Sequence, residues 1–490
     1  MLTPSAPSAN DVPPPRYRRT KIVATIGPAS CSLERLKELI VTGVNVFRLN
    51  FSHGTHASHL LSLNTIRQAA EQVGTPVAIL QDLSGPKIRI SEVEGDFAQI
   101  ADNKTIELRP ASGKKSSPSE IYVETLNPVN ILKAGEIVLL ADGIITLRAE
   151  EVRADCVVCR IVKGGRIRSR VGIAFPESNV LLPATTEKDF RDLQFGIDNK
   201  VDYVAISFVQ NAEDILAVRH AVQAQGGDIH IIAKIERKTA LENIESIMDC
   251  ADGLMVARGD LGLELPIEKL PRVQKELIEG GNSRGIPVIV ATQMLHSMIT
   301  SLRPTRAEVS DIATAVISGA DAVMLSEETA IGEHPAECVR VLDRVAFEAE
   351  QTFDFEEFRH RLHHTEKAIV PDSVAYAACA AAVKINAQAI IACTQTGTSA
   401  RLVAKYRPQR PLYGTSSRHE TINRMCLYWG VIPIPNESRE THADEVAMAL
   451  TAVRERQHVH KGARAVIIGG QVVNTPGTTS ILEVHKFLDD

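Results

Sequence analysis

The chain lacks the features that would place it in a membrane or send it out of the cell. Its runs of consecutive apolar residues all fall short of the ~20 residues that a membrane-spanning helix needs. Met1 to Arg16 is rich in proline, serine and alanine and has no apolar core of the kind that signal peptides carry. We therefore expect residues 1–19 to form a disordered tail, and we expect a cytoplasmic protein with no membrane partner.

Positive charge is not in excess either. The formal net charge is -6 at pH 7, and acidic and basic residues are interleaved along the chain. Because proteins that bind nucleic acid concentrate Lys and Arg on one surface, this balance argues against a nucleic-acid partner. The partners that remain are small molecules and further copies of the same chain.

Cysteine is present but follows no disulfide or metal-binding pattern. The eight cysteines are scattered through the chain, and we expect them to be reduced thiols. Cys156 and Cys159 form the one close pair, and no second pair or histidine pair follows to complete a zinc site. A metal or redox role for this pair stays open beside the simpler interpretation, which is alternation along a β-strand.

Eight short apolar runs, separated by helical patterns, dominate the first 350 residues. At about 150 residues per domain, the length of 490 residues predicts roughly three domains. The runs occupy residues 22–27, 44–51, 77–83, 203–208, 229–236, 253–258, 287–294 and 322–326. Alternation of strand and helix indicates parallel strands, so eight units predict an α/β fold, a (β/α)8 TIM barrel over residues 20–85 and 185–352.

The alternation of strands and helices is interrupted once and changes once, and each change indicates a further domain. Residues 86–184 contain short strand-like runs, turns such as Ala141–Gly143 and no long helical period, which indicates an all-β domain inserted after strand three. Residues 366–490 alternate strands and helices again on a smaller scale. We expect this last unit to be a smaller C-terminal α/β domain.

The strongest chemical signal lies in the fifth and sixth predicted barrel strands. Lys234 and Glu236 are two residues apart, so in an extended strand both side chains point the same way. Asp260 is expected to end the next strand and to join them. Two carboxylates suit a hard divalent cation such as Mg2+, and the lysine suits an anionic substrate. The alternative is a structural salt bridge at strand ends.

Polar residues also follow most of the other predicted strands, where barrel enzymes place their chemistry. They are Arg48, Asn50, Ser52 and His53 after strand two, Asp82 after strand three, Thr292 after strand seven, and Ser326 after strand eight. Gly259 and Gly262 flank Asp260, and small residues there would let backbone N–H groups approach an anion closely. An ordinary turn between strand and helix explains these glycines equally well.

A second candidate site lies in the C-terminal domain. Its first predicted strand runs into Thr394, Thr396, Thr398 and Ser399 just before a helix expected from about Ala400. Hydroxyls and free N–H groups at a helix start can bind phosphate. Helix capping by a Ser or Thr side chain is the alternative interpretation.

Beyond these local signals, nine segments of the chain occur in a familiar order. They are ATIGPAS, RLNFSHG, GPKIR, LPATTEKD, IIAKIE, MVARGDLGLE, ATQML, RPTRAE and DAVMLSEETA. From about Thr20 onward the chain closely resembles the pyruvate kinase family. The resemblance implies a catalytic barrel, a β lid and an effector domain, the same three units that the periodicity predicts. It also implies a cytoplasmic homotetramer that turns phosphoenolpyruvate and Mg-ADP into pyruvate and ATP.

The resemblance assigns roles to the polar residues of the barrel. Glu236 and Asp260 would hold Mg2+, Lys234 would stabilise the phosphoryl group in transit, and Arg48 would grip the phosphate. The backbone N–H groups of Gly259 and Asp260, with the Thr292 hydroxyl, would hold the substrate carboxylate. The enolate would receive its proton from water near Thr292 and Ser326. ADP or ATP would bind at Asn50, Ser52, His53, Arg89 and Lys188, and a phosphorylated activator at the loop from Thr394 to Ser399.

Two departures from the family pattern affect these expectations. Many members need K+, held by groups that match Asn50, Ser52, Asp82 and the carbonyl of Leu83. This chain has Lys87 where those members have an acidic residue, so we expect its ammonium to replace the ion and activity to be independent of K+. The alternative is that Lys87 faces solvent and K+ still binds. The second departure, Glu327 in place of a glycine, bears on the placement of Ser326.

Other functions remain open from the residues alone. A Mg2+-dependent aldolase of pyruvate-like acids also pairs a Glu with an Asp in a barrel, but it would have no use for the β insertion. An effector-binding scaffold without catalytic activity would be expected to have lost Arg48, Lys234, Glu236 or Asp260, and all four are present.

Overall fold

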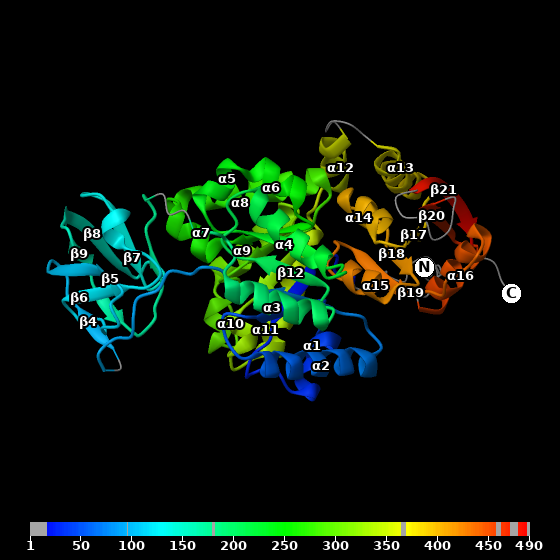
Figure 1. Ribbon diagram of the computed structural model, residues 1–490. Helices are drawn as coiled ribbons and strands as arrows, with labels where there is room; N and C mark the ends of the chain where they lie inside the picture. The colour runs from blue at the N-terminus through cyan, green and yellow to red at the C-terminus, as the bar shows by residue number, and fades with distance from the viewer. Residues whose placement is uncertain are drawn as a thin grey trace, which may run out of the picture.

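The computed structural model describes residues 17–95, 97–178, 182–363, 369–456, 462–470 and 479–487. Three units lie in a row, with the inserted β domain at one end, the barrel in the middle and the C-terminal unit at the other end (Figure 1). Within the described ranges, no helix combines the length and the apolar character that crossing a membrane requires.

The central unit is a closed barrel of eight parallel strands, which confirms the predicted (β/α)8 fold. The strands are β1 (Lys21–Thr25), β2 (Val46–Asn50), β3 (Ala78–Asp82), β12 (Tyr203–Ile206), β13 (His230–Ile235), β14 (Gly253–Ala257), β15 (Val288–Ala291) and β16 (Ala322–Leu325). Each strand is hydrogen-bonded to the next in the barrel, and β1 closes the ring by pairing with β16.

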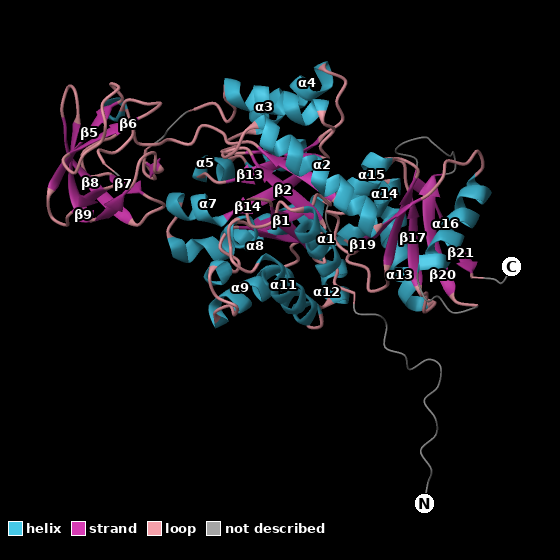
Figure 2. Ribbon diagram, turned by 90° about the horizontal axis from the view of Figure 1, so that it is seen from below, coloured by secondary structure: helices cyan, strands magenta, loops and turns pink. Residues whose placement is uncertain are grey.

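Amphipathic helices cover the outside of the barrel strands (Figure 2). They are α1 (Leu33–Thr42), α2 (His56–Val73), α3 (Glu187–Asp198), α4 (Ala212–Ala224), α5 (Lys238–Glu242), α6 (Ile244–Cys250), α8 (Leu270–Arg284), α9 (Arg306–Ile317) and α11 (Pro335–Glu350). Their apolar faces and the outward faces of the strands form the largest hydrophobic core. Asn243 separates the two short helices α5 and α6, which together cover one position of the barrel.

The inserted unit is all β, as the lack of helical periodicity predicts. Its strands are β4 (Ala98–Ile100), β5 (Thr105–Pro110), β6 (Glu120–Val123), β7 (Ile137–Leu140), β8 (Ile145–Val152), β9 (Val157–Lys163), β10 (Gly165–Ile167) and β11 (Ile173–Ala174). They form a six-stranded and a two-stranded sheet around a separate core. Cys156 and Cys159 are free, buried thiols at the start of β9. Ala141, Asp142 and Gly143 turn the chain between β7 and β8, all three with positive φ.

The C-terminal unit is a five-stranded sheet with helices on both faces. Its strands are β17 (Ala389–Cys393), β18 (Leu412–Ser416), β19 (Val431–Pro435), β20 (Arg464–Gly470) and β21 (Thr479–Lys486). Its helices are α13 (Val370–Lys384), α14 (Thr398–Lys405), α15 (His419–Met425) and α16 (His442–Arg456), and α12 (Phe355–His363) precedes them. The sheet has the order β19-β18-β17-β20-β21, and only β21 runs antiparallel.

The lid and the C-terminal unit meet opposite ends of the barrel. The lid is inserted after Asp82, at the carboxyl end of β3. At the amino ends, the Tyr203 hydroxyl donates to the carbonyl of Arg424, and the Lys21 ammonium donates to the carbonyl of Val431. The end of the barrel that carries catalytic residues in this fold therefore faces the lid.

Candidate active site

Lys234 lies at the centre of the carboxyl end of the barrel and is in contact with three side chains. Its Nζ is 2.9 Å from Oε1 of Glu236, 3.2 Å from Oδ1 of Asp82 and 2.6 Å from Oγ of Ser207. Lys234 in β13 and Glu236, the residue just after that strand, lie on the same side, as a spacing of two in an extended chain predicts. Burial alone would lower the pKa of Lys234, but the charges of Asp82 and Glu236 outweigh it and raise the pKa. The ammonium is therefore firmly charged.

Arg48, which is partly buried, is the second cation at this end of the barrel. Its Nε donates to Oδ2 of Asp82 at 2.7 Å, and its Nη1 donates to Oγ1 of Thr25 at 3.0 Å. Asp82 thus lies between two cations. Burial acts to raise the pKa of Asp82, but Lys234 and Arg48 lower it overall. The arrangement holds two positive groups side by side, facing one carboxylate.

Glu236 and Asp260 provide the two carboxylates expected near Lys234. Glu236 is buried and accepts the backbone N–H of Phe208 at 2.7 Å. Burial raises the pKa of Glu236, and the charge of Lys234 lowers it in part. The negative charge of Asp260 raises the pKa of Glu236 further, so the two carboxylates repel each other. Among the described residues, no third His, Cys, Asp or Glu completes a metal-binding cluster with them.

The expectation that Asp260 ends a strand is wrong. β14 ends at Ala257, and Asp260 lies in the first turn of the short helix α7 (Arg258–Glu264). The helix starts early because the N–H of Gly259 has a partner, Oγ1 of Thr292 at 2.9 Å, and so one helix-end donor is satisfied. The glycines around Asp260 consequently belong to a helix and not to an open turn.

Thr292 and Ser326 both lie just beyond barrel strands. Thr292 has a left-handed backbone with φ of 71°, and its carbonyl accepts Nη2 of Arg258 at 2.6 Å. The N–H of Ser326 donates to Oε2 of Glu328 at 2.6 Å. Glu327 is exposed, with Oε2 3.8 Å from Nδ1 of His296. Although Glu327 stands where the family usually has glycine, the backbone of Ser326 is still fixed by its hydrogen bond to the side chain of Glu328.

Four of the five nucleotide-binding candidates gather beside β2. Asn50, Ser52 and His53 lie at the end of β2 and in the loop that follows, and the Lys188 ammonium donates to the carbonyl of Phe51 at 2.9 Å. Lys188 also pairs with Asp192. Arg89 lies at the lid, where its Nη1 donates to the carbonyl of Arg170 at 2.8 Å.

Two of the groups expected to hold a monovalent cation, Asn50 and Asp82, are neighbours, and the described contacts of the Lys87 ammonium are with other carboxylates. Asn50 pairs in register with Asp82 across β2 and β3, and the Leu83 carbonyl accepts the Ser207 hydroxyl at 2.7 Å. The Nζ of Lys87 is 3.2 Å from Oδ1 of Asp260 and 3.6 Å from Oδ1 of Asp142. Burial would lower the pKa of Lys87, but these carboxylates raise it overall.

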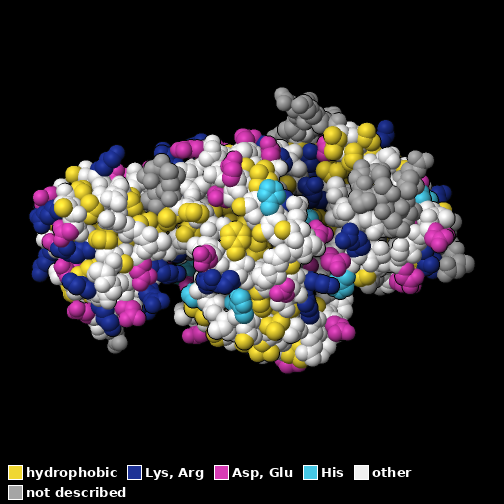
Figure 3. Space-filling view, in the orientation of Figure 1, with side chains coloured by type: hydrophobic (Ala, Val, Ile, Leu, Met, Phe, Trp, Pro, Cys, Tyr) yellow, Lys and Arg dark blue, Asp and Glu magenta, His cyan; other side chains and the backbone are white. Residues whose placement is uncertain are grey.

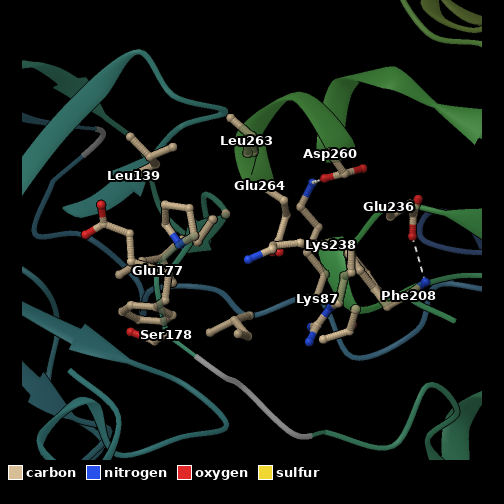
Figure 4. Close-up of a pocket in the computed structure, with 18 of the residues that line it drawn as sticks. Lys87, Leu139, Glu177, Ser178, Phe208, Glu236, Lys238, Asp260, Leu263 and Glu264 are labelled. Atoms are coloured by element: carbon tan, nitrogen blue, oxygen red, sulfur yellow. Dashed lines mark hydrogen bonds and ion pairs between the residues drawn. The ribbon is translucent and has the colours of Figure 1, made fainter. Parts of the chain in front are cut away.

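A cavity of about 250 Å3 separates the lid from the barrel at this point. Asp142 of the lid is among the residues that line it. Figure 4 shows Lys87, Glu236 and Asp260 around the same space. Leu139 of the lid and Leu263 of α7 also line this space, and Glu177, Lys238 and Glu264 bring further charges to its wall. A cleft of this kind excludes water around a charged centre when the lid closes.

The loop of the C-terminal domain begins α14 without a capping side chain. The helix N-cap is Gly397, with φ of 86°, so the alternative of Ser or Thr capping is wrong. Thr394 Oγ1 accepts the N–H of Gly397 at 3.0 Å, and Ser399 Oγ bonds Thr479 Oγ1 at 2.6 Å. Thr396 and Thr398 bond each other at 2.9 Å and line a cavity.

Comparisons with known proteins agree with this architecture. A family model described as the pyruvate kinase barrel domain matches residues 17–339, and a model of the pyruvate kinase alpha/beta domain matches residues 372–485. The chain belongs to the pyruvate kinase family. Its membership makes it a phosphotransferase with a requirement for a divalent metal ion.

Curated pyruvate kinases align with nearly the whole chain. Pyruvate kinase 2 of Synechocystis sp. is 40% identical over 477 residues, which cover 96% of this chain and 80% of that protein. The pyruvate kinase of Staphylococcus saprophyticus is 39% identical over 479 residues, covering 96% of this chain and 81% of the relative. The pyruvate kinase of Staphylococcus aureus strain MRSA252 is 38% identical over 476 residues with the same coverage.

The sequence analysis did not predict four groups that contact the candidate site residues of this pyruvate kinase fold. Ser207 and Thr25 are polar residues at the ends of β12 and β1, so the strand-end signal could have found both. The N–H of Phe208 carries no residue-type signal, because every non-proline residue has one. Asp142 lies on the lid, and only the packing of two domains brings it to Lys87.

Proposed function

We propose that this chain transfers the phosphoryl group of phosphoenolpyruvate to ADP, with Mg2+ and without K+, as the last step of glycolysis in the cytoplasm. The observation that carries the proposal is the contact of the Lys234 ammonium with two buried carboxylates, 2.9 Å from Glu236 and 3.2 Å from Asp82. By family resemblance we further propose a homotetramer.

Glu236 and Asp260 are the residues that would hold the metal ion. Their donors are carboxylate oxygens, which suit Mg2+, and the repulsion that raises the pKa of Glu236 would be relieved by a cation between them. Among the described residues no third His, Cys, Asp or Glu joins Glu236 and Asp260 as a possible ligand, so substrate oxygens and water would complete the coordination. Bound there, Mg2+ would offset negative charge on the substrate and the transferred group.

Lys234 and Arg48 would act on the phosphoryl group itself. Lys234 is buried and Arg48 is partly buried, and both have carboxylate partners that fix their positions before the substrate binds. Phosphoryl transfer needs spread negative charge neutralised more than it needs a covalent intermediate. Lys234 would stabilise the group in transit, and Arg48 would hold it before transfer.

The substrate carboxylate would lie against the start of α7. The N–H groups of Gly259 and Asp260 and the hydroxyl of Thr292 are the donors there, and the Gly259 to Thr292 bond of 2.9 Å would open to admit it. When the phosphoryl group leaves, C3 of the enolate must gain a proton to give pyruvate. We propose that water held near Thr292 and Ser326 delivers this proton.

The nucleotide would bind between β2 and the lid. Asn50, Ser52, His53 and Lys188 lie together, and Arg89 stands at the lid, so lid closure would bring a further cation onto the phosphates. Lys87 would replace K+ because its ammonium already neutralises carboxylates of the cleft. A phosphorylated activator would bind at the loop containing Thr394, Thr396, Thr398 and Ser399.

A coupled assay tests the reaction. Wild type, Lys234→Met and the control Lys275→Met are mixed with phosphoenolpyruvate, ADP and Mg2+, and pyruvate is read with lactate dehydrogenase. Lys275 is exposed on α8, away from the barrel mouth. We expect the wild type and the control to turn over alike and Lys234→Met to lose ~10³-fold or more, since it removes charge stabilisation of the transition state. Equal rates for all three chains would overturn the mechanism, and absence of pyruvate from the wild type would overturn the function in favour of an aldolase or a scaffold.

A further inference from the structure

A turn of the lid, between β7 and β8, packs on the short helix α7 of the barrel. Its residues Ala141, Asp142 and Gly143 have φ of 51°, 53° and 83°. A left-handed backbone is costly for the first two, because they carry a Cβ. A Cβ added at Gly143 would lie 3.0 Å from Cδ2 of Leu263, so the backbone of the turn comes very close to α7. A strained turn of this kind keeps its shape only through contacts with its surroundings.

Lys87 joins this turn to the same helix. Its Nζ donates to Oδ1 of Asp260 in α7 at 3.2 Å (Figure 4) and lies 3.6 Å from Oδ1 of Asp142 in the turn. The backbone of Gly172 fits closely against the side chain, since a Cβ added there would lie 3.0 Å from Cε of Lys87. Two carboxylates that would otherwise repel each other are thus held on either side of one ammonium. We call Asp142, Lys87 and Asp260 the lid bridge.

The lid bridge uses a carboxylate that is also a candidate ligand of the divalent ion. Asp260 and Glu236 are the two proposed ligands, and the charges of both are among those that raise the pKa of Lys87. An ion held by Asp260 would be about 2.1 Å from a carboxylate oxygen. The Lys87 ammonium is 3.2 Å from one. Two cations at one carboxylate repel each other, and the repulsion is strong where water is restricted.

A second lysine of the same cavity provides a comparison. Lys238 also lines the space between the lid and the barrel, but its side chain is exposed. Its ion pair within the described residues is with Glu242, at 3.9 Å, on its own helix α5. The charge of Lys238 therefore acts on the metal site only at longer range, whereas Lys87 bonds one of the two carboxylates directly.

We propose that the lid bridge and the divalent ion exclude each other: Lys87 weakens binding of the ion at Asp260, and Lys87 leaves Asp260 and releases the lid turn from α7 when the ion binds. The inference rests on the proposed function only in taking Glu236 and Asp260 as the metal ligands. Because such coupling is reciprocal, the factor by which Lys87 lowers the affinity for the ion is also the factor by which the ion weakens the lid bridge.

The exclusion gives the metal ion an unusual effect on the lid. Release of Lys87 from Asp260 removes an outside contact from a turn whose residues Ala141 and Asp142 are strained, so the turn opens more often with the ion bound than without it. A ligand that binds a folded protein ordinarily stabilises it and slows local opening. The opposite sign at the lid turn distinguishes release of the lid bridge from general stabilisation.

Electron paramagnetic resonance of free Mn2+ measures the affinity for the ion without catalysis. Mn2+ is titrated into the full chain, without substrate or K+, for wild type, Lys87→Met and Lys87→Arg. Asp260→Asn identifies the Mn2+ that occupies the candidate site, and Lys238→Met is the matched control for positive charge in the same cavity. We expect Lys87→Met to bind Mn2+ about tenfold or more tightly than the wild type, and Lys87→Arg and Lys238→Met to stay within about threefold of it. Unchanged or weaker binding by Lys87→Met, or an equal gain in either of the other lysine variants, would overturn the proposal.

Hydrogen exchange at the lid turn measures the lid bridge itself. The N–H of Gly143 donates to the carbonyl of Leu140 at 3.2 Å, so exchange at this position reports opening of the turn. We expect saturating Mn2+ to speed exchange of the turn several-fold in the wild type and to leave it unchanged in Lys87→Met, whose turn should exchange faster from the start. Slower or unchanged exchange in the wild type on addition of Mn2+ would overturn release of the lid.

The lid bridge and the proposed function fail by different results. Tighter Mn2+ binding by Lys87→Met in a chain whose wild type makes no pyruvate would uphold the lid bridge and refute the proposed function. Pyruvate formation by the wild type, with equal Mn2+ affinity in the wild type and Lys87→Met, would refute the lid bridge and leave the function standing. Mn2+ binding that Asp260→Asn does not change would overturn both the lid bridge and the proposed metal ligands.

Discussion

The Nζ of Lys87 lies 3.2 Å from Oδ1 of Asp260, so a residue at the hinge of the lid is bonded to the short helix that borders the candidate metal site. The same ammonium is 3.6 Å from Asp142 on the lid. One side chain thus links the lid to the barrel and supplies positive charge between them. Charged groups of both signs are otherwise interspersed over the visible face of the molecule (Figure 3).

Replacing Lys87 by glutamate should create a requirement for K+. Wild-type activity in tetramethylammonium buffer is expected to change by less than about twofold when K+ is added, because the tethered charge is already present. Lys87→Glu should lose tenfold or more without K+ and recover part of it with K+. Lys163→Glu, exposed on the lid, is the control. A many-fold stimulation of the wild type by K+ would show that Lys87 does not replace the ion.

Removing the lid should separate binding from turnover. The carbonyl of Ile88 accepts the N–H of Ile173 at 3.1 Å, so a short Gly-Ser linker can join these positions, and the lid has a core of its own. We expect the shortened chain to bind phosphoenolpyruvate by calorimetry but to lose ~100-fold or more in turnover, because water stays in the cleft and Arg89 is gone. Turnover equal to that of the full chain would refute a catalytic role for the lid.

Asp202 should make stability depend on pH. Asp202 is buried, and burial raises its pKa to about 7. The N–H of Ile79 donates a hydrogen bond to this carboxylate, which favours the charged form and opposes the rise in pKa. The folded chain therefore holds a proton that the unfolded chain releases above pH ~4. The stability of the wild type relative to Asp202→Asn should fall between pH ~4 and ~7 and stay flat above that. Thermal unfolding of both chains across this range tests the sign, and a difference that grows as pH rises would contradict it.

Arg407 should be essential for joining the C-terminal domain to the barrel. It is 1% exposed and pairs with Asp321 at 3.0 Å, beside the first residue of β16. Arg407→Ala leaves a buried, unpaired carboxylate, which costs about 3–5 kcal/mol. Arg340→Ala, in an exposed ion-pair network, should cost less than about 1 kcal/mol.

The melting temperature measures both changes. Adding Asp321→Asn to Arg407→Ala should restore part of the loss, because the unpaired charge is removed. Equal shifts in melting temperature for Arg407→Ala and Arg340→Ala would contradict a joining role for Arg407.

Sequence alone predicted most of the fold because strands and helices differ in the period of their apolar residues. The spacing of Lys234 and Glu236 was enough to place both on one side of β13. The position of Asp260 was wrong, since a helix start stabilised by the Thr292 hydroxyl depends on a residue 32 positions away. The residues close to Asp260 in the sequence do not indicate a contact with Thr292.

Contacts between domains could not be predicted from the sequence for the same reason. Nothing near Lys87 in sequence indicates Asp142, and nothing near Tyr203 indicates the carbonyl of Arg424. These pairs exist only because folded units pack together, so only the structure shows them.

A crystal structure with Mn2+ and oxalate, a small dicarboxylate that can stand in for the enolate of pyruvate, tests the proposed metal site. Anomalous scattering from manganese gives the position of the ion. We expect the ion within about 2.2 Å of carboxylate oxygens of both Glu236 and Asp260, with the Lys234 ammonium beside the oxalate. Manganese bound elsewhere, or Glu236 and Asp260 turned away from each other, would contradict it.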